Sequence, residues 1–173
     1  MSYEPDRPLV REVAEGDQGA FAALFEAHHR EVYRIGQAIA GDHELAKDVV
    51  QETFLKVFRG MSGWRGAASL KTWIFRIAVR TAIDQRRRAR RYSQLSSVSA
   101  EPSHDPRARM DAALALQRLQ ELAEGLPGQQ GLILRLRLLG DLKNTEIAEI
   151  LGLTPANVRM QCSKAVRRLR AML

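Results

Sequence analysis

Apolar residues recur every three or four positions along most of this chain, which is the spacing of helices with one buried face. The pattern predicts helices at about 8–15, 18–40, 43–59, 70–91, 110–124, 128–139, 145–151 and 155–172. No stretch shows the strict alternation that is typical of an amphipathic strand. The sequence therefore predicts an all-α protein.

Two breaks in this periodicity divide the chain. The segment 60–69 contains three glycines and two serines, which indicates a loop, and Ser69 is placed to cap the next helix. In the second break, 92–109, serines and prolines replace the apolar residues, as is typical of a flexible linker. We therefore expect two small helical domains, 8–91 and 110–173, joined by the flexible linker 92–109.

The helix expected at 43–59 has two faces of different character. Asp48, Gln51 and Glu52 fall at positions i, i+3 and i+4 and share one polar edge, whereas the opposite side is formed by small apolar residues and Thr53. The apolar side is suited to packing, and the acidic edge is free to bind a partner. A merely solvated edge is the alternative interpretation.

The net charge of +7 is distributed unevenly along the chain. Residues 57–91 carry ten Lys and Arg against the single acid Asp84, and residues 141–173 carry six against three, whereas residues 1–56 are acidic. Two separate basic blocks favour two contacts with nucleic acid over a uniformly basic, solvated surface.

The segment 145–158 has the order of a helix-turn-helix. Gly152 is placed to turn the chain, Thr154 to cap the second helix and Pro155 to occupy its first position, where no N–H donor is needed. Val158, Cys162, Ala165 and Leu169 form the inward stripe of that helix, and no acid follows Pro155. The outward residues near its start, where DNA bases are usually read, are Asn157, Arg159, Met160, Gln161, Ser163 and Lys164.

Composition excludes several classes of protein. A lone cysteine, Cys162, excludes an internal disulfide and a multi-cysteine metal site, and we expect it to be a buried small residue. No ligand cluster or catalytic motif accompanies the histidines His28, His29 and His43. We therefore expect no metal, no cofactor, no small-molecule substrate and no catalysis. No apolar run approaches the roughly 18 residues of a membrane span, and the N-terminus lacks the features of a signal peptide, which predicts a cytoplasmic protein without membrane insertion.

Three motifs in order carry a family resemblance over about 150 of the 173 residues: DVVQETFLKVF from Asp48, SLKTWIFRIAVRTAID from Ser69 before an arginine run, and TEIAEILGLTPANVR from Thr145. Together they resemble bacterial RNA polymerase sigma factors of the sigma-70 family, in particular the small extracytoplasmic-function (ECF) group that keeps only regions 2 and 4. The resemblance implies that 8–91 is region 2, which docks on polymerase and recognises and melts the minus-10 promoter element. It implies that 110–173 is region 4, which reads the minus-35 element.

The resemblance also implies roles for individual residues. The helix that begins near His43 would dock on the coiled coil of the polymerase β′ subunit through Asp48, Gln51, Glu52, Leu55 and Phe58. The minus-10 DNA would be bound by Trp64, Arg65, Arg76, Arg80, Arg86, Arg87 and Arg88. Trp73 is expected in the core, whereas Trp64, in the glycine-rich loop, is the freer aromatic residue. The minus-35 DNA would be read by Asn157, Arg159, Met160, Gln161, Ser163, Lys164 and Arg167.

The implied partners are core RNA polymerase, through its β′ coiled coil and β subunit, and promoter DNA. With no long inhibitory N-terminal region, such a factor would be active whenever it is free, so we expect control by an anti-sigma factor. Arg80 stands where relatives commonly carry Asn, so readout near the minus-10 element is expected to differ. A polymerase-independent helix-turn-helix regulator is the alternative; it accounts for the C-terminal half alone.

Overall fold

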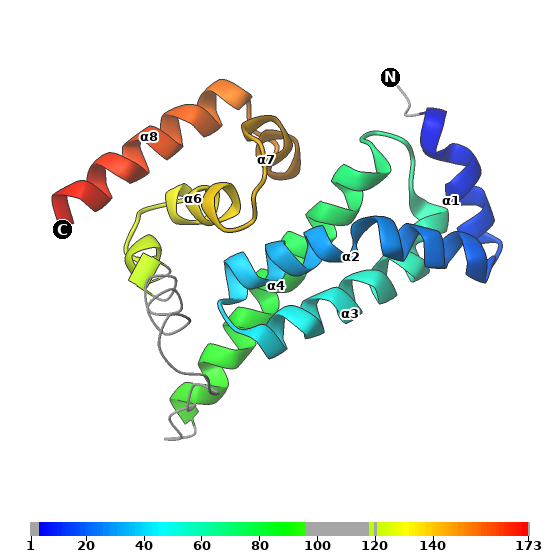
Figure 1. Cartoon of the computed structure of the whole chain (residues 1–173), viewed down its shortest axis with the longest axis horizontal. Helices are drawn as coiled ribbons and strands as arrows, with labels where there is room; N and C mark the ends of the chain where they lie inside the picture. Colours follow the sequence, from blue (N-terminus) through cyan, green and yellow to red (C-terminus); the bar gives the residue numbers. More distant parts are fainter. Residues whose placement is uncertain (1–3, 96–117, 120, 173) are drawn as a thin grey trace.

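A computed structural model describes residues 4–95, 118–119 and 121–172 of the chain (Figure 1). The helices that it defines are α1 (Arg7–Ala14), α2 (Gln18–Ala40), α3 (His43–Gly60), α4 (Leu70–Leu95), α6 (Gln130–Leu138), α7 (Asn144–Leu151) and α8 (Pro155–Met172). Short 3-10 turns occur at Glu4–Asp6 and Met61–Gly63, and no strand occurs among the described residues. The all-α prediction is confirmed.

Local signals explain where the first helices begin and end. The Asp17 carboxylate accepts a hydrogen bond from the Ala20 N–H at 2.9 Å and caps α2, and Asp42 caps α3 through the Leu45 N–H at 2.8 Å. Gly41 separates the two helices with a φ of 79°, a left-handed conformation that a residue without a Cβ adopts readily. These caps turn the chain back on itself and place α2 beside α3.

Helices α2, α3 and α4 form an elongated bundle, and α1 lies across one of its ends (Figure 1). Its core is fully buried and combines side chains from all three long helices: Leu24, Val32, Ile35, Val49, Phe54, Val57, Ile74, Phe75 and Ala78. The start of α4 is held twice, because the Leu70 N–H donates to Asp6 and the Thr72 N–H donates to the Ser69 hydroxyl. The predicted Ser69 cap is confirmed.

Helices α6, α7 and α8 form a second, smaller group (Figure 1). Gly152, with a φ of 69°, ends α7, and the Thr154 hydroxyl accepts a hydrogen bond from the Asn157 N–H at 3.1 Å at the start of α8. Leu134 of α6 packs with Ala165 and Leu169 of α8 in a separate apolar cluster. This is the helix-turn-helix that the sequence predicts.

The two groups of helices are packed against each other. Helix α7 contacts α4 and α6 contacts α2, and Ile133, Leu136 and Ile147 join the apolar core of the first bundle. The connection between the groups was predicted as a linker at 92–109. Residues 92–95 of that stretch complete α4, and the rest lies outside the described residues, as does most of the helix predicted at 110–124.

Candidate polymerase and DNA interfaces

One side of α3 is exposed along its length. Asp48 and Gln51 are exposed, and Leu55 and Phe58 each leave 48% of their surface accessible. The opposite side of the helix is fully buried, including Ala46, Val49, Thr53 and Val57. We call Asp48, Gln51, Leu55 and Phe58 the α3 face; two large apolar side chains beside an acid are a typical composition for a protein-binding surface.

Glu52 does not belong to this exposed face. Its carboxylate lies 2.7 Å from Lys56 Nζ, accepts a hydrogen bond from Gln85 of α4 at 2.5 Å, and lies 3.9 Å from Arg88. The hydrogen bond from Lys56 is the main reason why the pKa of Glu52 lies below its usual range. The prediction of a free acidic edge was therefore wrong at Glu52, because Gln85 of α4 lies close enough to bind its carboxylate. At Asp48 and Gln51 the edge is exposed, as predicted.

The loop after α3 forms one wall of a pocket. A cavity of about 500 Å³ lies between the loop and α1 and is lined by Arg7, Arg11, Met61, Ser62, Trp64 and Arg65, among others. Trp64 is half-buried and packs against the core, and its Nε1 is buried without an acceptor among the described residues. Trp64 was expected to be the freer of the two tryptophans, but it also packs against the core, because α1 covers the loop. Trp73 is likewise half-buried against the core.

The predicted minus-10 arginines of α4 fall into two groups. Arg80, Arg87 and Arg88 are exposed. Arg76 and Arg86 instead contact the C-terminal helices: the Arg76 guanidinium donates to the Glu149 backbone carbonyl at 3.2 and 2.7 Å, and Arg86 pairs with Glu124. Two of the five predicted minus-10 arginines of α4 are thus engaged by the second domain.

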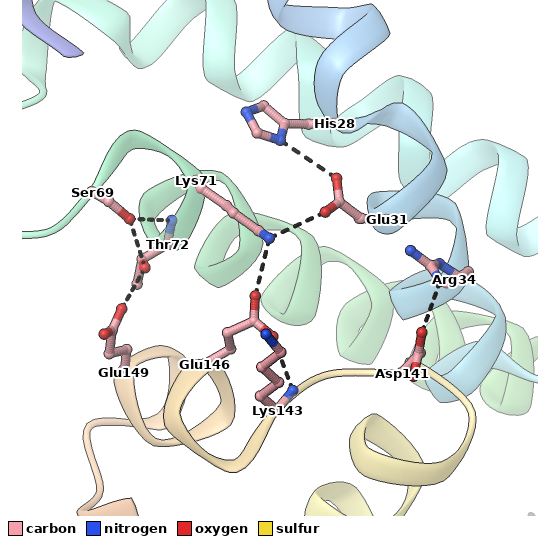
Figure 2. Close-up of polar contacts among 10 residues, drawn as sticks. All are labelled: His28, Glu31, Arg34, Ser69, Lys71, Thr72, Asp141, Lys143, Glu146 and Glu149. Carbon is pink, nitrogen blue, oxygen red and sulfur yellow. Dashed lines mark hydrogen bonds and ion pairs between the residues drawn. The ribbon is translucent and has the colours of Figure 1, made fainter. Parts of the chain in front are cut away.

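Figure 2 shows the polar network between the two domains. Lys71 of α4 lies between Glu31 of α2 and Glu146 of α7, with its Nζ at 3.1 and 3.0 Å from their carboxylates. Beside it, the Thr72 hydroxyl donates to the Glu149 carboxylate at 2.7 Å, and Arg34 lies 3.2 Å from Asp141. The network joins the first turn of α4 to α7.

The charges in this network are stabilised by their partners. Burial alone would raise the pKa of Glu146, but its hydrogen bond from the Lys143 N–H and its contact with Lys71 outweigh burial and lower that pKa. Burial alone would likewise lower the pKa of Lys71, and the hydrogen bonds to Glu146 and Glu31 raise it. Glu146 and Lys71 are therefore both charged at neutral pH.

Most predicted minus-35 residues lie on the open side of α8. The exposed members of this set are Arg159, Met160, Ser163, Lys164 and Arg167. Gln161 and Asn157 are half-buried, and the Asn157 Oδ1 is buried without a donor among the described residues. Asn157 does not point freely outward, because it lies in the first turn beside the cap. Cys162 is half-buried, and burial raises the pKa of its thiol.

Several residues at the domain junction carry no local signal in the sequence. Glu124 pairs with both Arg86 and Arg90, and Arg135 of α6 is buried nearby. The stretch GLILRLRLL carries two arginines among apolar residues, Arg135 and Arg137, and its pattern does not indicate that Arg135 is the buried one. Among the described residues, no group of three or more His, Cys, Asp or Glu is arranged to hold a metal ion. Within the same part of the chain, no helix combines the length and apolarity needed to cross a bilayer.

Comparisons with known proteins agree with both domains. Residues 24–92 match sigma-70 region 2, and residues 116–169 match sigma-70 region 4. The chain is 30% identical to the ECF RNA polymerase sigma-E factor of Escherichia coli (strain K12) over 173 aligned positions, covering 92% of this chain and 90% of the relative. It is 29% identical to the ECF sigma factor SigM of Mycobacterium tuberculosis (strain H37Rv), covering 97% and 84%.

Solved structures show the same fold. CnrH in complex with the cytosolic domain of CnrY aligns with a TM-score of 0.69 and 23% identity over 96% of both chains. The sigma factor RpoE with the anti-sigma factor NepR from Bartonella quintana aligns with a TM-score of 0.61 and 22% identity, over 87% of this chain and 94% of that one. A free-standing helix-turn-helix regulator is not favoured, because the chain matches region 2 in addition to region 4, and such a regulator would account for the C-terminal half alone. The chain belongs to the ECF group of RNA polymerase sigma factors, within the sigma-70 family.

Proposed function

We propose that this sigma factor docks on the β′ coiled coil of core RNA polymerase through the α3 face. The observation that carries the proposal is the exposure of Leu55 and Phe58, at 48% each, beside Asp48 on a helix whose other side is completely buried. Apolar side chains surrounded by polar ones form the energetic centre of many protein interfaces. Glu52, bound by Lys56 and Gln85, has the role of holding α3 against α4.

The pocket beside Trp64 is suited to a base taken out of the DNA stack. Its volume of about 500 Å³ lies within the range of small-ligand sites, which is roughly 300–1,000 Å³. Arg7, Arg11 and Arg65 bring positive charge to the pocket, and the Trp64 ring supplies an aromatic wall. Stacking on an aromatic side chain contributes about 1–3 kcal/mol per base, which helps to keep the minus-10 strand open.

The basic surfaces of α4 and α8 are suited to the two ends of a promoter. On α4, Arg80, Arg87 and Arg88 are exposed and able to contact phosphates next to the melted strand. On α8, Arg159, Lys164 and Arg167 are exposed on one helix of a helix-turn-helix, the arrangement that enters a major groove. We propose that the β subunit supports region 4 while α8 reads the minus-35 element.

The packed arrangement of the two domains has to open before both elements are read. Positions minus-35 and minus-10 are about 85 Å apart along B-DNA at roughly 3.4 Å per base pair. A compact chain of this length has a radius of gyration of only about 16 Å. Arg76 and Arg86 would also have to release Glu149 and Glu124 to contact DNA. The packed state is therefore a form of the free factor that does not initiate transcription.

Control by an anti-sigma factor fits this picture. CnrH and the Bartonella RpoE were each solved in a complex, with CnrY and with the anti-sigma factor NepR. We propose that a comparable partner sequesters this factor in the cytoplasm, where polymerase and chromosome are found, and that the chain directs transcription without catalysing a reaction itself. A factor that occupies core polymerase fully in stressed and unstressed cells alike would contradict sequestration.

Reconstituted transcription tests the function. Purified protein is mixed with bacterial core polymerase and a library of promoter fragments, and transcript ends are mapped. We expect defined start sites with shared sequences near minus-35 and minus-10. The absence of initiation, together with tight DNA binding in the absence of polymerase, would overturn the proposal.

A further inference from the structure

A second cavity lies between the C-terminal half of α4 and α6, at the junction of the two domains. Its volume is about 320 Å³. Arg86, Arg87 and Arg90 line it from α4, Arg135 lines it from α6, and Ile83 and Leu132 provide apolar walls. Four guanidinium groups therefore surround a space that is partly apolar.

Arg135 is the least expected of these groups. Only 8% of its surface is exposed, and its Nε and Nη1 are buried without a hydrogen-bond acceptor among the described residues. Burying a guanidinium without an acceptor destabilises a protein, and an apolar residue of similar size would pack in the same place without that penalty. An arginine at this position therefore indicates that an acceptor is supplied from outside the described residues, and a bound ligand is one such source.

The charges around the cavity are not balanced by the described residues. Glu124 pairs with Arg86 and Arg90. Arg87 and Arg135 have no acidic partner in the described part of the chain. Burial, together with the positive charges of Arg135 and Arg90, lowers the pKa of Arg86 to about 10, and burial next to Arg90 lowers that of Arg135. The site has an excess of positive charge in a partly dry environment.

We propose that this cavity binds a small phosphate-type anion that bridges Arg87 of region 2 and Arg135 of region 4. The planar guanidinium fork matches the oxygen atoms of a phosphoryl group and binds them in pairs. A DNA duplex does not fit, because Arg135 is enclosed between helices, whereas a phosphate or pyrophosphate ion does. The bound anion stabilises the packed arrangement of the domains and competes with promoter DNA for Arg86 and Arg87.

Calorimetric titration of the free, full-length protein tests this site without polymerase, so its result is independent of the proposed function. The probe is inorganic pyrophosphate at constant ionic strength. We expect one ion per chain, and at least tenfold weaker binding for Arg135→Gln and for Arg87→Gln. Arg88→Gln removes the same charge at the next position of α4, outside the cavity, and is expected to change the affinity less than twofold. Arg87 is exposed, so its variant folds even if Arg135→Gln does not.

Three results would overturn the inference. The first is the absence of pyrophosphate binding at millimolar concentration. The second is an equal loss of affinity in Arg87→Gln and Arg88→Gln, which would identify general attraction to a basic surface. The third is a short single-stranded oligonucleotide that binds more tightly than pyrophosphate with the same dependence on Arg135, which would make the cavity a DNA contact.

Discussion

At Gly131, a single methyl group decides whether α6 fits beside the preceding turn. A Cβ at this position would overlap the backbone carbonyl of Ala123. Backbone atoms cannot move aside as the end of a flexible side chain can, so α6 would have to shift away from residues 121–124.

We expect Gly131→Ala to lower the free energy of unfolding by about 2–3 kcal/mol, the cost of overpacking a tight core. The measurement is urea denaturation followed by circular dichroism. Gly63→Ala is the control, because a Cβ there meets no atom within 4 Å. Equal stability of the two variants would show that α6 packs less closely than described.

His28 makes the stability of region 2 depend on pH. Burial lowers the pKa of its imidazole below the usual 6.5, with Glu31 at 3.6 Å as a partly opposing influence. Below pH 6.5 the unfolded chain therefore binds this proton more readily than the folded protein does. We expect the free energy of unfolding to fall as the pH is lowered through 6.5 towards the folded-state pKa, and to fall less in His28→Gln. Identical pH profiles for the two proteins would contradict this account.

At the scale of the element, the cap of α8 controls the start of the proposed minus-35 reader. The Thr154 hydroxyl satisfies the Asn157 N–H at 3.1 Å, next to Arg159 and Met160. We expect Thr154→Ala to cost about 1 kcal/mol and to weaken binding to a minus-35 duplex, because the first turn of α8 frays. Thr145→Ala, at an exposed position of α7, is the control in both thermal denaturation and fluorescence anisotropy. If both variants bind the duplex like the unchanged protein, the cap does not position the reader.

Helix bounds were predictable where their signals are local. The bounds of α2 and α8 agree with the prediction, because Gly41 and the cap Thr154 lie within a few residues of the ends that they set. The two-faced character of α3 was predictable for the same reason. The engagement of Glu52 was not, because it depends on Gln85, 33 positions away.

At the scale of the whole molecule, the packing of the two domains was not predictable from the sequence. Thr72 and Glu149 are 77 positions apart, and no periodic pattern connects them. The prediction of two domains joined by a flexible linker did not include the contacts of Arg76 and Arg86 with region 4. The composition of the surfaces was visible in the sequence, and their mutual contact was not.

Lys71 is the position at which this packing is most directly tested. Lys71→Glu replaces two attractive contacts, with Glu31 and Glu146, by repulsion. Each half-exposed ion pair contributes at most about 1 kcal/mol, so we expect a partial shift towards separated domains and not unfolding. Small-angle X-ray scattering should show a larger radius of gyration than for Lys47→Glu, whose lysine pairs with Glu44 within α3. Equal radii for the two variants would rule out a role for Lys71 in closing the molecule.

The affinity of the purified factor for core RNA polymerase tests the central claim most directly. We expect Asp48→Arg to lower this affinity at least about tenfold, which corresponds to about 1.4 kcal/mol, because it reverses the charge of the acid in the α3 face. Glu12→Arg makes the same charge reversal at an exposed position of α1 and is expected to bind within about twofold of the unchanged protein. A folded Asp48→Arg variant that binds core polymerase as tightly as Glu12→Arg would contradict docking through α3.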